Sequence, residues 1–288
     1  MSTPMNLTRR DFMKVATAAG GGLVLGFYLP SNEAVPAGMS PETFWPNAWL
    51  KIMSDGGVRI TVAKSEMGQG VWTSLPMIVA EELDADWNKV TIEQADAHPT
   101  RYGSQTTGGS FSVRGSWQTL RNAGATARDM LISAAAQKWN VKKSTCRAEN
   151  GFVFNASGKK LSYGELAVLA VNVPIPHSVK LKEEKNFKLI GKRTPKFDTP
   201  EKVYGKAVFG LDVRVPGMVF ASIEKCPVFG GKVASFDATK AKSFPGVLDV
   251  VQIDDGVAVI ATSTWAAFKG REALTVTWNE GQWASQSS

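Results

Sequence analysis

The chain has 288 residues, 43% of them hydrophobic and 20% charged, and a net charge of +7 at pH 7. This length can form one large domain or two ordinary ones, and the apolar content is sufficient for globular cores. The positive charge does not indicate nucleic-acid binding, because Arg9, Arg10 and Lys14 lie at the amino terminus and the lysines between 180 and 206 alternate with acidic residues. The two cysteines and two histidines stand apart, so side chains of this chain are not expected to bind zinc or an iron–sulfur cluster.

Residues 1–30 predict an export signal. The stretch "TRRDFMK" is similar to a twin-arginine signal, and the glycine-rich apolar run after it ends at Pro30. That run is short for a bilayer span, which takes about 20 apolar residues. We therefore expect export in the folded state by the twin-arginine machinery and a periplasmic location, with the signal as a membrane tether where it is not cleaved. The alternative is an ordinary amphipathic first helix with a chance Arg-Arg pair.

After a linker at 31–44, residues 45–175 predict a first α/β unit. Apolar and polar residues alternate over "GGVRITVAKS" and "NKVTIEQADA", as is typical of half-buried strands. Between them, apolar residues from Val71 to Leu83 recur at helical spacing, with Thr73 or Ser74 expected to cap the helix and Pro76 expected in its first turn. The sequence thus predicts strand, loop, helix and strand.

A second loop rich in small residues, "RYGSQTTGGSFSVRG", precedes a long predicted helix. Arg114, Arg121 and Arg128 recur on one stripe of that helix, which we interpret as its solvent face. A hairpin turning at 155–158 and a short helix at 163–171 follow.

Prolines and lysines then mark a predicted solvated linker at 176–200. Residues 201–280 predict a second unit of α+β type, and residues 281–288 a polar tail. The expected strands are 207–215, 218–223, 247–253, 256–261 and 275–278, and the expected helices are 237–244 and 264–274.

Both glycine loops stand at the entrance to a helix, where free backbone N–H groups and the positive end of the helix dipole favour a polar or anionic ligand atom. One such loop is weak evidence, because a tight turn without a ligand needs glycine equally. Two neighbouring entrances suggest a large, flat, polar cofactor, since a mononucleotide would need only one. This interpretation requires that the backbone at Gln69 and at Ser110 lie on the same side of the molecule.

Four stretches together resemble the molybdenum-binding large subunits of the xanthine oxidase and aldehyde oxidase family, in particular the exported isoquinoline 1-oxidoreductase beta-subunit type. They are "EMGQGVWTSLPMIVAEELDADWNKV", "GGSFSVR", "GKAVFGLDVRVPGMVFASIEKCPVFGGKV" and "VAVIATSTWAAFKGREALTVTW". The resemblance covers nearly the whole chain. It implies an α+β fold in which residues 45–175 are the first part of a molybdopterin-binding domain and residues 201–280 an α/β hammerhead domain.

The resemblance also implies a molybdenum cofactor held through the dithiolene of a pterin, in this branch as molybdopterin cytosine dinucleotide. The cofactor-binding residues that match the family's two loops are Gly68, Gln69, Gly70, Gly109, Ser110 and Ser112. No side chain of this chain is then needed as a metal ligand.

The family's activity is that of an oxidoreductase, which hydroxylates N-heteroaromatic compounds or oxidises aldehydes with water. Electrons pass to a small subunit with 2Fe-2S clusters and onward to an acceptor such as a cytochrome. In the family, the substrate-facing residues and a general-base glutamate lie beyond the hammerhead domain, so we assign no catalytic residue and expect this chain alone to be inactive. Glu66, Glu81 and Glu82 are the nearest candidates, but helix position predicts that Glu81 and Glu82 are solvated.

Two alternatives of other classes stay open. One is a shortened, cofactor-free binding or assembly module in the periplasm. The other is an α+β protein that binds a different anionic ligand at the same helix entrances.

Overall fold

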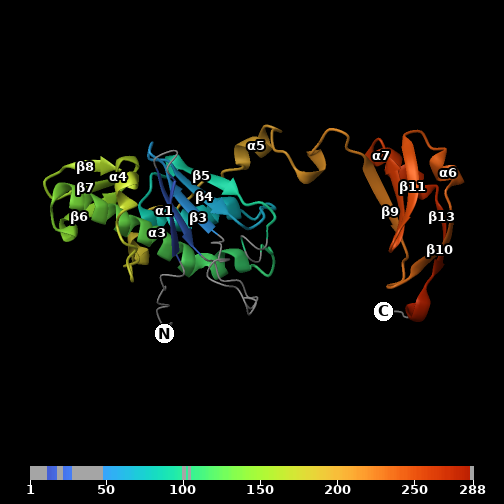
Figure 1. Cartoon of the computed structure of the whole chain (residues 1–288), viewed down its shortest axis with the longest axis horizontal. Coiled ribbons are helices and arrows are strands. Elements are labelled where there is room, and N and C mark those ends of the chain that lie inside the picture. Colours follow the sequence, from blue (N-terminus) through green and yellow to red (C-terminus); the bar gives the residue numbers. More distant parts are fainter. Residues whose placement is uncertain (1–11, 18–21, 28–47, 99–101, 103–104, 286–288) are drawn as a thin grey trace. The chain divides into compact units, whose positions relative to one another are not determined.

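The structure is a computed structural model that describes residues 12–17, 22–27, 48–98, 102 and 105–285 (Figure 1). The chain divides into two compact units, Met1–Ala207 and Val208–Ser288. No helix in the described ranges has the length and apolar character needed to cross a membrane.

A five-stranded sheet forms the centre of the first unit, in the order β1-β2-β3-β4-β5. Its strands are β1 (Phe12–Thr17), β2 (Gly22–Phe27), β3 (Ala48–Ile52), β4 (Val58–Val62) and β5 (Val90–Gln94). Neighbouring strands are antiparallel except β4 and β5, which are parallel and joined by helix α1 (Val71–Leu83). The predicted succession of strand, loop, helix and strand is confirmed.

Strands β1 and β2 were not predicted, because they fall within residues 1–30, which the sequence assigned to an export signal. Leu23 of β2 is fully buried and pairs with Ile52 of β3. The signal itself and the periplasmic location stay predictions. The predicted linker at 31–44 lies outside the described residues.

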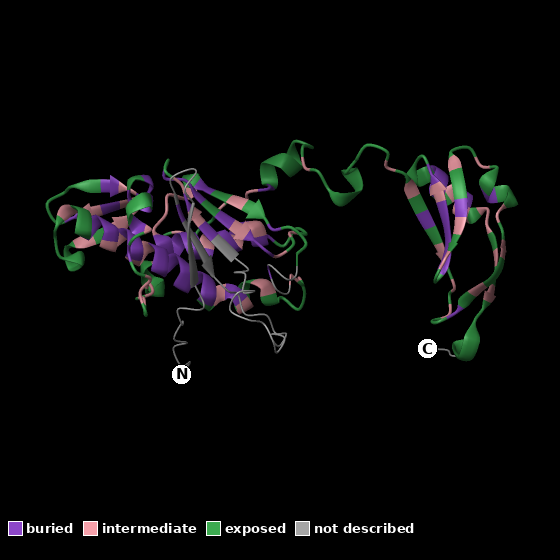
Figure 2. Cartoon of the chain, in the orientation of Figure 1, coloured by how far each residue is buried: buried purple, intermediate pink, exposed green. Residues whose placement is uncertain are grey.

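Helices complete the first unit around the sheet. After α1 come α3 (Phe111–Trp139), a three-stranded meander and α4 (Tyr163–Ala170). The meander consists of β6 (Cys146–Glu149), β7 (Phe152–Asn155) and β8 (Lys160–Ser162). One core unites apolar side chains from the sheet and from all three helices, as the buried residues in Figure 2 show.

The start of α1 differs from the prediction. Gly70, in a left-handed conformation with φ 87°, precedes the first helical residue, so Thr73 and Ser74 lie inside the first turn and do not cap the helix. Pro76 is therefore the sixth residue of α1 rather than a first-turn proline, and the hydrogen bond that its missing N–H would donate is absent there.

The segment predicted as a solvated linker belongs to the first unit. Residues 180–198, here called the strap, bind α1 and α3 through backbone groups and lysine side chains. The boundary between the units accordingly follows Ala207 instead of lying at 176–200. The prolines and lysines were interpreted as signs of solvation, but Lys182 pairs with the buried carboxylate of Glu81 and with Asp84.

The second unit contains two antiparallel sheets with two short helices. One sheet has the order β11-β12-β9 and the other pairs β10 with β13. The elements are β9 (Phe220–Lys225), β10 (Lys232–Asp237), α6 (Thr239–Lys242), β11 (Val247–Ile253), β12 (Gly256–Ala261), α7 (Thr264–Glu272) and β13 (Thr275–Asn279). The α+β class is confirmed, and the assignment as a hammerhead domain stays a prediction.

Two details of the second unit differ from the sequence reading. Strand β10 was missed, and residues 207–215 are not a strand. That stretch has exposed apolar side chains around a 3₁₀ turn at Gly210–Asp212. Its alternation of Val and polar residues suits a strand, but no neighbouring strand in the described part of the chain pairs with it. The remaining short elements are α5 (Thr199–Val203) and 3₁₀ turns at Trp87–Lys89, Lys143–Thr145, Glu184–Asn186 and Gly281–Trp283.

Candidate functional site

The two glycine loops leave the sheet at the same edge. The first loop (residues 63–70) follows the carboxyl end of β4, and the second loop (residues 95–110) follows the carboxyl end of β5. Because β4 and β5 are parallel neighbours, both loops begin side by side at the same edge of the sheet.

Hydrogen bonds join the two loops directly. Lys64 Nζ donates to the Thr106 carbonyl at 3.0 Å, and the Ser65 N–H donates to Thr107 Oγ1 at 3.1 Å. Gln105 also bonds both ways with the segment after β5, through the Asp96 carbonyl and the His98 N–H. The loops therefore share one side of the first unit, as a common ligand requires.

Inside the first loop, the Glu66 carboxylate occupies the helix entrance. One carboxylate oxygen accepts the N–H groups of Gly68 and Gly70 at 2.7 and 2.9 Å, and the other accepts that of Trp72 at 3.1 Å. Burial raises the pKa of Glu66, but these N–H bonds outweigh it and hold the pKa below its ordinary value of 4.5. The expectation that this entrance offers free N–H donors to an anionic ligand is wrong, because a carboxylate of the chain already binds them.

Gln69 bonds within the same loop. Its side-chain oxygen accepts the Met67 N–H at 2.7 Å, and its side-chain nitrogen donates to the Ser65 carbonyl at 2.8 Å. Lys196, from the strap, donates to the Gly68 carbonyl at 2.7 Å. The loop is thus held by its own side chains and by a lysine 128 positions further along the chain.

The glycines leave open space on both loops. A Cβ built on Gly68, Gly108 or Gly109 would meet no described heavy atom within 4 Å. Gly68 and Gly109 also have φ values of +103° and +58°, which side chains rarely adopt. A bulky ligand can therefore approach the backbone at these positions.

The second entrance is different from the first. Ser110 precedes α3 in a left-handed conformation with φ 53°, and no described side chain caps the helix there. Ser112 is the second residue of α3, where the N–H groups have no carbonyl partner within the helix. This entrance, unlike that of α1, has donors that no side chain described in the structure takes.

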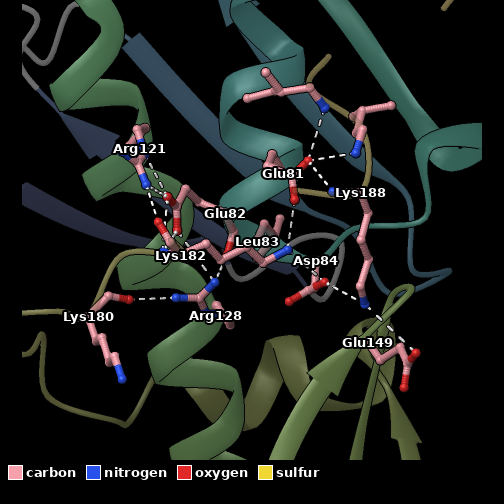
Figure 3. A network of polar contacts seen from close by, with 12 residues as sticks. Glu81, Glu82, Leu83, Asp84, Arg121, Arg128, Glu149, Lys180, Lys182 and Lys188 are labelled. Atoms are coloured by element: carbon pink, nitrogen blue, oxygen red, sulfur yellow. Dashed lines mark hydrogen bonds and ion pairs between the residues drawn. The ribbon is translucent and has the colours of Figure 1, made fainter. Parts of the chain in front are cut away.

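Glu81 and Glu82, at the other end of α1, are buried and not solvated as predicted; their exposed fractions are 2% and 0%. Figure 3 shows both carboxylates facing charged groups. Glu82 accepts from Arg121 Nε at 2.7 Å and from the Lys182 N–H at 3.0 Å, and its Oε2 lies 3.5 Å from Arg128 Nη1.

The arginine row on α3 is correspondingly not a solvent face. Arg121 and Arg128 donate to Glu82 and also to strap carbonyls, at Lys182 and Lys180 (Figure 3). Only Arg114 of the three lies exposed. Two guanidinium groups therefore tie α1, α3 and the strap together.

Glu81 binds the strap through the backbone. One of its oxygens accepts the N–H groups of Lys188, Leu189 and Ile190 at 2.7–3.0 Å, and the other accepts Lys182 Nζ at 2.9 Å. Further along, the Phe197 N–H donates to Thr73 Oγ1 in the first turn of α1. The strap therefore runs from the buried carboxylates to the glycine loop, which Lys196 contacts.

Sequence reasoning missed several of these residues. Glu66 was considered only as a catalytic candidate, because a glutamate four residues before the residue that caps a helix is not part of the usual capping pattern. Thr106, Thr107 and Lys196 were not singled out, and no local pattern places Lys196 beside the first loop. Among the described residues, no group of three or more His, Cys, Asp or Glu side chains could hold a metal ion.

The fit of a bulky, polar ligand can be judged from the two loops. Gly68, Gly108 and Gly109 face open space, Ser110 and Ser112 lie at an uncapped helix start, and Gln69 is exposed. Five of the six predicted residues thus lie on two adjoining loops and Ser112 lies in the first turn of α3, although no hydrogen bond among described residues joins Gln69 to Ser110. The residues present suit a bulky, polar ligand.

Residues 12–217 match the family model described as a molybdopterin cofactor-binding domain. Isoquinoline 1-oxidoreductase subunit beta of Brevundimonas diminuta is 33% identical, over 95% of this chain and 40% of that protein. The membrane-bound aldehyde dehydrogenase [pyrroloquinoline-quinone] of Gluconacetobacter polyoxogenes is 33% identical, over 96% of this chain and 38% of that protein. The chain thus spans about two fifths of the length of these curated relatives.

Among solved structures, this chain is similar to quinoline 2-oxidoreductase from Pseudomonas putida 86. The similar region covers 46% of this chain and 18% of that one. The sequence identity is 21% and the TM-score 0.37.

Proposed function

The chain belongs to the xanthine oxidase family of molybdenum-binding subunits, and from this premise we propose that it forms the amino-terminal part of the large subunit of a molybdenum hydroxylase. The observation that carries the proposal is the direct contact between the two glycine loops at Ser65 and Thr107. The proposed reaction is hydroxylation of an N-heteroaromatic compound, or oxidation of an aldehyde, with water.

The residues that would hold the cofactor are those of the two loops. Gly68 and Gly109 leave open space in which it could approach the backbone, and Gly70 supplies the left-handed residue before α1. Gln69 offers an amide, and Ser110 and Ser112 lie at the uncapped entrance of α3. The bound cofactor would supply the molybdenum and the redox chemistry of the reaction.

The chain's own contribution is binding and orientation. Glu66 takes the donors at the α1 entrance, so anionic groups of the cofactor are better accommodated at the α3 entrance, where the helix dipole is uncompensated by a side-chain cap. The amide of Gln69 keeps one N–H that is not used by the Ser65 carbonyl. These two features orient a flat ligand across both loops.

Further parts of the proposal rest on the family resemblance and the sequence signal. We propose the cytosine dinucleotide form of the cofactor, a small 2Fe-2S partner subunit that receives the electrons, and a cytochrome as a later acceptor. Twin-arginine export to the periplasm would deliver the folded, loaded protein. The names of the two relatives, an isoquinoline oxidoreductase subunit and an aldehyde dehydrogenase, support the two substrate classes.

The test is the molybdenum content of the purified full-length protein and of its Gln69→Ala variant. We expect stoichiometric metal in the parent and a several-fold loss in the variant, because the substitution removes the loop bonds to Ser65 and Met67 together with the amide offered to the cofactor. A matched control is Gln118→Ala, which removes an exposed glutamine on α3 away from both loops. Equal molybdenum in all three proteins would contradict the role of Gln69.

The same measurement separates the alternatives. A full-length protein without molybdenum would favour the cofactor-free assembly module. Metal-free protein that carries a phosphate or a quinone instead would favour a different ligand at these loops.

A further inference from the structure

Glu66 is the charged group that determines the shape of the first loop. It is half-buried, and its two oxygens bind three backbone N–H groups on both sides of Gln69. Gly68 and Gly70 need positive φ values to point those N–H groups inward. The carboxylate therefore fills the place that an external anion would occupy at this helix entrance.

The consequence reaches Gln69, which lies between the two glycines. With Gly68 and Gly70 held by Glu66, the backbone on each side of Gln69 is fixed, and the side-chain amide can bond to Ser65 and Met67. Without the carboxylate, the N–H groups of Gly68, Gly70 and Trp72 would lose their acceptor, and Gln69 would be the side chain left to bond within the loop.

Other charges surround this group. Lys196 holds the Gly68 carbonyl from the strap, and the charges of Asp198 and Lys202 lie near enough to influence the loop. Asp198 and Lys202 are themselves paired, so they compensate each other. Glu66 thus accepts the N–H groups of Gly68, Gly70 and Trp72, and Lys196 donates to the Gly68 carbonyl.

We propose that Glu66 is a positioning residue, which keeps the Gly68–Gly70 loop in the conformation that binds the cofactor and excludes an external anion from the start of α1. This inference rests on the proposed function. Glu66 does not need to touch the cofactor, because it acts through the backbone around Gln69.

The experiment compares four versions of the full-length protein: the parent, Glu66→Gln, Glu66→Ala and Glu165→Gln. Glu165 is the matched control, since it caps α4 together with Ser162 in an exposed capping box and lies outside both loops. Two quantities are measured: hydrogen exchange in the peptide that spans residues 65–73, and molybdenum content.

We expect exchange in that peptide to be about tenfold faster in Glu66→Ala, as the loss of hydrogen bonds worth about 1.4 kcal/mol implies. Glu66→Gln should be intermediate, because one oxygen still accepts from Gly68 and Gly70 while the amide nitrogen meets the Trp72 N–H. Molybdenum content should fall in the same order, and Glu165→Gln should match the parent in both quantities.

A loss confined to the Glu66 variants separates the role of this carboxylate in the loop from the general effect of replacing a glutamate that binds backbone N–H groups, which the Glu165 control carries. Parent-like exchange in Glu66→Ala, or molybdenum content equal to that of Glu165→Gln, would overturn the proposal. If the parent itself contains no molybdenum, the proposed function fails, and the exchange data alone then decide whether Glu66 holds the loop.

Discussion

Removing the negative charge of Glu82 should destabilise the first unit strongly. Its side chain is fully buried and bonds to Arg121, Arg128 and the Lys182 N–H. Both guanidinium groups are themselves mostly buried, with exposed side-chain fractions of 10% and 15%, so they cannot regain full hydration when the carboxylate is lost. Breaking a buried ion pair by removing one partner costs about 3–5 kcal/mol, and we expect Glu82→Gln to lie at the lower end because it keeps the shape.

The assay is urea unfolding of the full-length protein, followed by tryptophan fluorescence. With an m-value of about 2–3 kcal/mol per molar urea, this loss lowers the midpoint of the first unit by about 1–2 M. Glu149→Gln serves as control, because Glu149 is 46% exposed and its ion pairs with Arg147 and Lys188 are at the surface. Such pairs contribute less than about 1 kcal/mol. A midpoint for Glu82→Gln no lower than that of Glu149→Gln would refute the reasoning.

Three further predictions concern the same unit. Gly124→Ala should lower the free energy of unfolding by about 1–3 kcal/mol, because the new Cβ would lie 2.4 Å from the Val79 carbonyl oxygen. The control is Gly108→Ala, whose Cβ meets open space and should leave the urea midpoint unchanged. Burial raises the pKa of Glu81, but the hydrogen bonds from Leu189 and neighbouring groups of the strap lower the pKa by more. The pKa of Glu81 therefore lies below its ordinary value of 4.5. The stabilisation from Glu81 is therefore present above pH 4.5 and is lost as the pH falls through the folded-state pKa, so Glu81→Gln should flatten the fall in urea midpoint on acidification. Thr73→Val removes the acceptor of the Phe197 N–H and should speed limited proteolysis within the strap, at a cost of about 1 kcal/mol; unchanged cleavage would show that this bond does not hold the strap.

Local patterns were sufficient for much of the framework. The alternation in β4 and β5 and the helical spacing in α1 were readable, and because β4 and β5 are parallel, the two loops after them had to lie together. The tight turns at the loop glycines could also be predicted from the sequence, because residues other than glycine rarely adopt positive φ values.

The wrong predictions have a common physical cause. The charged residues concerned form ion pairs and hydrogen bonds with residues far away in the sequence. Glu82 and Arg121 look like surface residues of two amphipathic helices when each helix is considered alone. Their burial follows only from the approach of α1 to α3 and from the strap carbonyl at Lys182, which lies 100 residues after Glu82. No local window contains these partners.

The start of α1 illustrates the same limit at short range. Thr73 was a reasonable cap by residue type, but its hydroxyl binds the Phe197 N–H of the strap. The cap comes instead from Glu66, which reaches forward across the glycines. Residue preferences therefore identified the helix and misplaced its first turn.

The strap also sets where the polypeptide can be cut. Excision of the first unit at residue 175, at the end of the predicted domain, would delete the N–H groups of Lys188, Leu189 and Ile190 and leave Glu81 with its carboxylate facing nothing of opposite sign. A recombinant first unit intended to fold independently has to extend to Ala207, so that Glu81 and Glu82 keep their hydrogen-bond donors from the strap.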